Sequence, residues 1–179
     1  MDSYMERLSQ AIAAAIDGMN SAELNRHLGE KWSVAEVLEH LYLTYTGTLK
    51  AFERCLQAGK PLAGVPTFRQ KVSIALVTEF GYFPTGRKSP DRVRPQGLAA
   101  EKVVADIGPK IAAMDEMIAQ CEARYGSRIR LLDHPVLGPL TGRQWRKFHL
   151  AHGQHHVKQI LERRKLGRVE VSETEKPSA

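Results

Sequence analysis

Cysteine is scarce in this sequence, and a long apolar run is absent. The two cysteines, Cys55 and Cys121, are far apart and belong to no CxxC pattern, which indicates buried free thiols in a reducing cytoplasm. No apolar stretch approaches the length that spans a bilayer. The first residues include acidic side chains and lack the basic start and continuous apolar run of a secretory signal. We therefore expect a cytoplasmic protein with no membrane partner.

A dense block of charge of one sign is also missing. The net charge is +6 and the pI is near 9.4, but Lys and Arg are spread over loops and helix ends, with no aromatic residues interleaved among them. Nucleic-acid-binding domains usually concentrate positive charge on one face or in one run. We therefore expect no nucleic-acid partner. A length of 179 residues, with 42% hydrophobic and 26% charged residues, fits a single globular domain.

Helical periodicity is what the sequence does contain. Apolar residues recur at helical spacing in residues 3–20, 33–57, 98–125 and 141–165, which predicts four amphipathic helices. Ser33 and Glu36 form a capping box at the start of the second helix. Pro109 lies inside the third, where we expect a kink or a brief break. Thr141 is the predicted N-cap of the fourth helix, and Gly167 is its predicted C-terminal stop.

These four helices, with no convincing strand between them, predict an all-α fold. The expected architecture is a four-helix bundle over residues 1–166 with long Pro/Gly-rich crossover loops, followed by a polar and flexible tail over residues 167–179. Residues 128–140 are one such loop, whereas residues 65–80 have the spacing of a short helix.

The loop of residues 82–96 is rich in Gly, Pro and Arg. Long ordered loops in compact domains are often functional, so we expect this one to lie at the mouth of the site. Its basic side chains, Arg87, Lys88, Arg92 and Arg94, could attract an anionic thiol or an acidic substrate. The simpler alternative is a solvated charged loop.

Four of the seven histidines lie in the last helix. His152 and His156 are four residues apart, so their imidazoles project from one face about 40° apart around the axis, as two ligands of one metal ion would. His149 falls near the same face, and His155 points to the other side of His152. The alternative is that these are solvated or hydrogen-bonded histidines with no metal.

A third ligand is needed for a metal site, and His40 is the candidate. It lies two turns into the second helix, on a stripe shared with the small or polar Thr44, Gly47 and Thr48. These small and polar neighbours indicate that His40 faces a cavity. The alternative is a hydrogen-bonded histidine in the core. Because metal sites in helical bundles form between facing helices, His40 can reach the histidines of the fourth helix.

Three segments, taken in order, resemble the DinB/YfiT-like superfamily of metal-binding four-helix proteins. They are KWSVAEVLEHL, GRKSPDRVRP and HPVLGPLTGRQWRKFHLAHGQHHVKQI, and the likeness extends over most of residues 1–166. The resemblance implies an up-down-down-up bundle, often homodimeric, with a divalent ion such as zinc or nickel. The metal-ligand positions of that family match His40, His152 and His156.

Three neutral imidazoles leave a divalent ion its full charge and at least one open position, which is typical of a catalytic site. The resemblance implies a transferase that uses a low-molecular-weight thiol such as bacillithiol or mycothiol on a small-molecule substrate. A metal-dependent hydrolase and a non-catalytic metal-binding or stress-response module remain alternatives. An HExxH protease is disfavoured, because Gly153, Gln154 and His155 separate the two ligands. The candidate catalytic residues are Glu36, His149 and His155.

Overall fold

The structure, a computed structural model, describes residues 1–82 and 89–174, with side chains described as far as residue 167. The helices are α1 (Ser3–Ile16), α2 (Ser21–Asn25), α3 (Val34–Gln57), α4 (Phe68–Phe80), α5 (Ala100–Tyr125) and α6 (Gly142–Thr174). A short 3-10 helix, η1 (Asp91–Val93), and the strands β1 (Arg130–His134) and β2 (Gly138–Thr141) complete the described elements.

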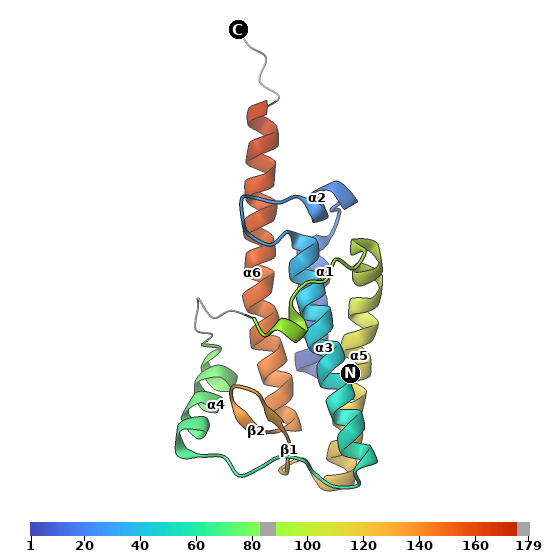
Figure 1. Ribbon diagram of the computed structural model, residues 1–179, viewed down its shortest axis with the longest axis vertical. Coiled ribbons are helices and arrows are strands. Elements are labelled where there is room, and N and C mark those ends of the chain that lie inside the picture. The colour runs from blue at the N-terminus through green and yellow to red at the C-terminus, as the bar shows by residue number, and fades with distance from the viewer. Residues whose placement is uncertain (83–88, 175–179) are drawn as a thin grey trace.

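The four predicted helices correspond to α1, α3, α5 and α6, which pack around one apolar core. α3 lies along α5 and α1 lies along α6, while α6 runs the length of the molecule (Figure 1). The core is built from the apolar positions of the helical repeat, including Leu8, Ile12, Leu38, Phe52, Ile111 and Ile118, all of them fully buried. The mostly helical architecture is therefore confirmed, and the up-down-down-up order of the helices stays a prediction.

One part of the fold prediction is wrong: the chain is not purely α. Within residues 128–140, predicted as a loop, β1 and β2 form an antiparallel hairpin in which Leu132 pairs with Leu140. The sequence is misleading here because its Pro and Gly residues suggest a loop throughout. Pro139 nevertheless belongs to β2, since each strand of a two-stranded sheet has a free edge at which a missing N–H is tolerated.

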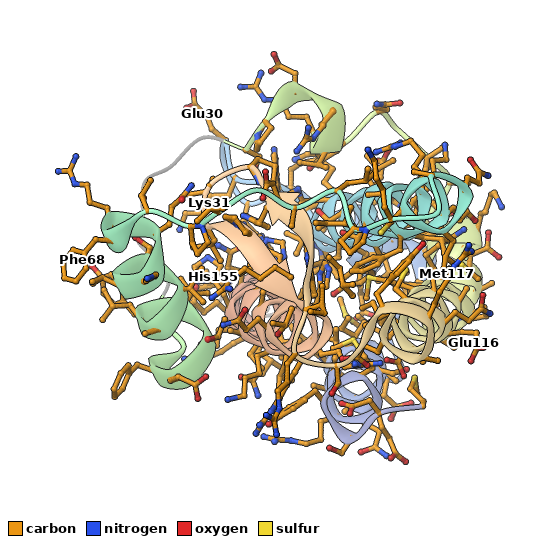
Figure 2. The ribbon with its side chains drawn as sticks, turned by 90° about the horizontal axis from the view of Figure 1, so that it is seen from below. Glu30, Lys31, Phe68, Glu116, Met117 and His155 are labelled. Atoms are coloured by element: carbon orange, nitrogen blue, oxygen red, sulfur yellow. The ribbon has the colours of Figure 1, made fainter. Side chains whose placement is uncertain are left out.

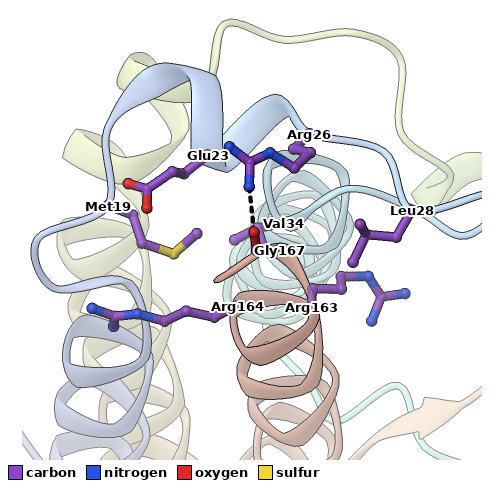
Figure 3. Close-up of a pocket in the computed structure, with 8 residues that line it drawn as sticks. All are labelled: Met19, Glu23, Arg26, Leu28, Val34, Arg163, Arg164 and Gly167. Atoms are coloured by element: carbon purple, nitrogen blue, oxygen red, sulfur yellow. Dashed lines mark hydrogen bonds between the residues drawn. The ribbon is translucent and has the colours of Figure 1, made fainter. Parts of the chain in front are cut away.

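The end of the last helix also differs from its prediction. α6 continues through Gly167 to Thr174, so Gly167 is not a helix stop. A Cβ at this position would lie 3.0 Å from a guanidinium nitrogen of Arg26, which donates to the carbonyl of Gly167 at 2.8 Å (Figure 3). The absence of a side chain at Gly167 therefore leaves room for Arg26, the residue that follows α2. Residues 175–179 of the predicted tail lie outside the described residues.

Other details of the prediction are resolved more simply. α5 continues through Pro109 without a break. Cys55 and Cys121 are buried free thiols, as expected. Residues 65–80 do contain a helix, α4, which begins with a capping box at Thr67. None of the described helices combines the length and the apolar character that crossing a membrane requires.

A buried ion-pair cluster holds the first turns of α6 against α5. The Arg146 guanidinium donates to Asp115 Oδ1 and to Glu122 Oε2, both at 2.6 Å. The other Asp115 oxygen accepts the backbone N–H of Asp2 at 2.6 Å. Because buried charges are costly unless they are paired, this cluster fixes where α6 begins relative to α1 and α5.

α4 and the hairpin cover one side of α6, in the half that carries the histidines (Figure 1). In the end-on view His155 lies on the side of α6 toward α4, whereas Glu116 and Met117 of α5 lie on the opposite side of the molecule (Figure 2). Lys147 of α6 donates to Glu79 of α4 at 2.5 Å. These elements surround the middle of α3 and α6 and so position the site.

Candidate metal centre

The predicted capping box orients the start of α3, on which the first metal-ligand candidate lies. Glu36 Oε2 accepts the N–H of Ser33 at 2.7 Å, and Ser33 Oγ accepts the N–H of Glu36 at 3.2 Å. His40 lies one turn after Glu36 in the same helix, and its side chain is only 3% exposed. The cap therefore fixes the helix register that directs His40 toward α6.

The structure brings His40, His152 and His156 together. His152 Nε2 lies 3.4 Å from His40 Nε2 and 3.1 Å from His156 Nε2. One potential ligand atom from each of the three residues lies within 4.8 Å of the other two. Zinc–nitrogen bonds of about 2.0–2.1 Å in tetrahedral geometry separate two ligand nitrogens by about 3.3–3.4 Å. The two separations from His152 are therefore close to those of ligands around one small cation.

Hydrogen bonds on the outer nitrogens fix the tautomers of two of these rings. His40 Nδ1 donates to the carbonyl of Val93 at 2.8 Å, and His156 Nδ1 donates to Gln159 Oε1 at 3.0 Å. In a neutral imidazole that donates from Nδ1, Nε2 carries a lone pair. At least two lone pairs therefore converge at the centre of the site, and a cation satisfies such a group better than hydrogen bonds can.

Burial keeps the three rings uncharged at neutral pH. It lowers the pKa of His40, although the bond to Val93 acts in the opposite direction. It lowers the pKa of His156 to about 3, helped by the charge that His40 would carry. The pKa of His152 is lowered well below its ordinary value, again mainly through burial. Each of the three rings therefore keeps one unprotonated nitrogen that can bind a metal without competition from protons.

The loop of residues 82–96 takes part in this arrangement through its described residues. The Val93 carbonyl that holds His40 belongs to η1, which lies against α3. The N–H groups of Gln96 and Gly97, which follow η1 in the chain, donate to the buried Glu39 carboxylate of α3 at 2.7 and 3.1 Å. The prediction that this loop lies at the site is confirmed for Tyr82 and for part of residues 89–95, which line the cleft described next. Pro84, Arg87 and Lys88 lie outside the described residues.

A cleft of about 1650 Å³ opens over the three histidines. Its walls come from α3, α4, α6, the η1 segment and the hairpin. Basic side chains that line the cleft include Lys31, from the segment before α3, Arg54, Arg92 and Arg163, and apolar ones include Leu76 and Phe148. Sites for small molecules are commonly about 300–1,000 Å³, so this cleft has room for a substrate as well as an ion.

Comparison with known families agrees with the geometry. The family model described as the DinB superfamily matches residues 4–160, which include all three histidines. The chain belongs to the DinB superfamily. No curated protein and no solved structure matches it. The family assignment and the three-histidine cluster together fit metal binding.

His149 lies outside the metal-ligand group of this DinB-superfamily chain. It is fully buried one turn before His152 and does not line the cleft. Its ring stacks on Trp145, with centroids 5.7 Å apart, and meets the Tyr45 ring edge-on at 5.5 Å. Burial lowers its pKa to about 3. As a catalytic candidate, His149 is therefore not placed where a substrate would lie.

The other two catalytic candidates do line the cleft. His155 is half-buried at the rim, where its Nε2 accepts a hydrogen bond from the Gln159 amide at 3.1 Å. Glu36 also faces the cleft, with one carboxylate oxygen in the capping box. Gln159 thus contacts both His155 and the ligand candidate His156.

Three residues of the site were not found by reasoning from the sequence. Gln159 follows His156 by three residues, and this i,i+3 spacing is the signal that could have identified it. Glu39 looked like an ordinary charged helix residue, and only its burial shows that it holds the loop. His134 of β1 also lines the cleft, and its part of the chain was predicted as a loop.

Proposed function

We propose that His40, His152 and His156 bind one divalent metal ion, zinc or nickel, and that the protein is a thiol S-transferase acting on a small molecule. The observation that carries the proposal is the convergence of the three imidazoles, two with fixed tautomers, at the floor of a large cleft. Such an ion would act as a Lewis acid that lowers the pKa of a thiol or water bound to it.

The residues of the chain itself hold and orient the reacting groups. Val93 and Gln159 fix the two outer imidazoles, so their lone pairs need no reorganisation when the metal binds. Phe148 stacks on His152, with ring centroids 5.5 Å apart, and contributes an apolar wall beside the site. That wall excludes water from one side of the reacting atoms.

A proton acceptor for the incoming thiol is available at the rim. His155 is held by Gln159, which also orients His156, so it is positioned relative to the metal site. Glu36 lies one turn before His40 and is the second candidate, although its capping bond to Ser33 withdraws one of its oxygens. We propose His155 as the base; because its one lone pair accepts the Gln159 amide, that hydrogen bond breaks when the ring takes up the proton.

Metal content and thiol binding test this proposal directly. The purified protein should contain close to one equivalent of zinc or nickel. The cobalt-substituted form should develop a thiolate-to-cobalt charge-transfer band when a low-molecular-weight thiol is added. His40→Ala, which removes a ligand from a different helix, is the control and should show neither property.

The alternatives predict different results in the same experiment. Turnover of an ester or amide without any thiol would support a metal-dependent hydrolase. Metal binding with neither the thiolate band nor turnover would support a non-catalytic metal-binding or stress-response module. Absence of metal from the wild-type protein, together with failure to take up added zinc, nickel or cobalt, would contradict the proposal altogether. The homodimer that the family resemblance implies stays a prediction, which light scattering in solution can test.

A further inference from the structure

His134 is the histidine of the cleft that no role described so far explains. It ends β1, and its Nδ1 accepts the backbone N–H groups of Val136 and Leu137, both at 3.1 Å. A ring nitrogen that accepts two hydrogen bonds carries a lone pair, so in the neutral ring the hydrogen is on Nε2. The hairpin turn therefore fixes the tautomer of His134 as the opposite of that of His40.

The fixed tautomer presents a donor to the cleft. The turn occupies the Nδ1 edge, which leaves Nε2–H as the free donor of a ring that lines the cleft, and no described residue accepts its hydrogen. Burial and the nearby Arg92 lower the pKa of His134 to about 4, so the ring is neutral at pH 7 and keeps this arrangement. His134 is therefore a permanent hydrogen-bond donor on the wall of the cleft.

The surroundings of His134 define what that donor can bind. Its ring contacts Phe148, with centroids 4.2 Å apart, and Phe148 in turn stacks on the metal-ligand candidate His152. Arg92 adds a positive charge close enough to influence His134. The neighbouring Asp133 carboxylate accepts the N–H of Gly64 at 3.1 Å. One apolar side chain thus separates the three-histidine site from a donor beside a positive charge.

We propose that His134 is a specificity-determining residue that binds a carboxylate of the substrate, whose apolar chain crosses Phe148 and whose reacting end lies at the three histidines. This inference rests on the proposed function and names its substrate class, a small molecule with an apolar chain and a carboxylate at the far end. Direct hydrogen bonding to an anionic group strengthens the interaction relative to a neutral acceptor.

Two substitutions separate this binding role from the role of His134 in the turn. His134→Asn keeps an acceptor for the N–H groups of Val136 and Leu137, because asparagine caps its own following turn, but it has no atom that reaches the Nε2 position. His134→Gln places an amide donor near that position and loses the turn acceptor. Circular dichroism and thermal melting of both variants establish whether the fold is retained.

The probes are thiols of graded length on the cobalt-substituted protein. Mercaptobutyrate, mercaptohexanoate and mercaptooctanoate are compared with the mercaptoalcohols of the same length by titration of the thiolate band. We expect one acid length to bind at least several-fold more tightly than its alcohol. His134→Asn should reduce that preference by about tenfold, the value of one charge-assisted hydrogen bond, without changing the affinity for the alcohol. His134→Gln should restore part of the preference.

A second arm does not depend on the metal. Hexanoate, but not hexanol, should shift the imidazole NMR signals of His134 in metal-free protein and should bind more weakly to His134→Asn. If wild type binds acids and alcohols equally in both arms, or if His134→Asn weakens both kinds of ligand alike, the inference is wrong. If the protein takes up no metal, the proposed function fails, and the hexanoate arm still decides the role of His134.

Discussion

Two neighbouring histidine environments on α6 differ in what contacts their ring nitrogens. At the cleft floor, the outer nitrogen of His156 bonds Gln159, and that of His40 across the site bonds Val93. One turn before His152, His149 is buried among Trp145, Phe148 and Tyr45. Neither of its nitrogens has a hydrogen-bond partner among the described residues. Hydrogen bonds thus orient the rings of the two outer ligand candidates, whereas the neighbours of His149 only bury it.

Gly153 lies between the two environments on α6 and lets Leu8 of α1 and Tyr45 of α3 approach that helix closely. A Cβ there would lie 2.1 Å from Leu8 Cδ1 and 3.2 Å from Tyr45 Oη. Gly153→Ala should therefore destabilise the protein by about 1–3 kcal/mol, the range for overpacking a core, measured as the urea unfolding midpoint. It should also lower metal occupancy, because α1 and α3 can no longer approach α6.

Gly47→Ala is the matched control for that substitution. Gly47 lies inside α3, and a Cβ there would meet nothing within 4 Å. Replacing an unstrained helix glycine by alanine typically stabilises by about 0.5–1 kcal/mol. Equal effects of the two substitutions would show that α1 and α3 do not pack on Gly153 as described.

Removing the bond on the outer nitrogen should weaken metal binding without abolishing it. Gln159→Ala leaves His156 free to rotate, and contacts of this kind typically contribute about 10–100-fold to metal affinity. The measurement is competition with a chelator of known zinc affinity. Gln154→Ala, an exposed glutamine on the same helix, is the control and should have no effect. Comparable losses in both variants would contradict the assigned role of Gln159.

His149 should behave as a buried base instead of a ligand. Its pKa is about 3 in the folded chain and about 6.5 when unfolded, so the unfolded state binds its proton first. The contribution of neutral His149 to the free energy of unfolding is therefore fully present above about pH 6.5. It is lost as the pH falls toward 3. His149→Leu should reduce the slope of unfolding free energy against pH in that window by up to about 1.4 kcal/mol per pH unit in chelator-treated protein. An unchanged slope would mean that the burial of His149 is not as described.

The smallest effect is expected from charge at the mouth of the cleft. Arg94 is paired with Asp91 at 3.0 Å, whereas Arg92 has no ion pair among the described residues. Arg92→Glu should weaken binding of mercaptohexanoate a few-fold at low salt, and the difference should shrink as salt screens the charge. Arg128→Glu, an exposed arginine outside the cleft lining, should leave the affinity unchanged. An affinity and salt dependence equal to wild type in Arg92→Glu would exclude steering by this residue.

The helices of this chain follow from local sequence, and so does much of their capping. The Ser33–Glu36 box and the apolar repeat are short-range patterns, and both are present in the structure. The hairpin was missed because the same Pro and Gly residues suit a loop and a hairpin turn. Gly167 was misassigned because a glycine beside a helix end suggests a stop, whereas here Arg26, the residue that follows α2, contacts it.

Some features of the site likewise follow from local sequence, whereas others depend on contacts between distant residues. Spacing alone selects His152 with His156, and the family resemblance adds His40. What orients them could not be predicted, because the acceptor for His40 is the backbone carbonyl of Val93, and every residue type has such a carbonyl. The opposite tautomers of His40 and His134 depend on contacts made only after folding. Tertiary neighbours, which no periodicity encodes, therefore decide which histidines can bind metal.

Metal stoichiometry of five single alanine variants, measured at one pH, tests the central claim most directly. His40→Ala, His152→Ala and His156→Ala should each lose most of the bound metal, because each removes one of three converging nitrogens. His149→Ala and His155→Ala should retain much more of it, since neither belongs to that group. Loss of metal from His149→Ala or His155→Ala as complete as from His152→Ala, or full retention by His40→Ala, would contradict the assignment.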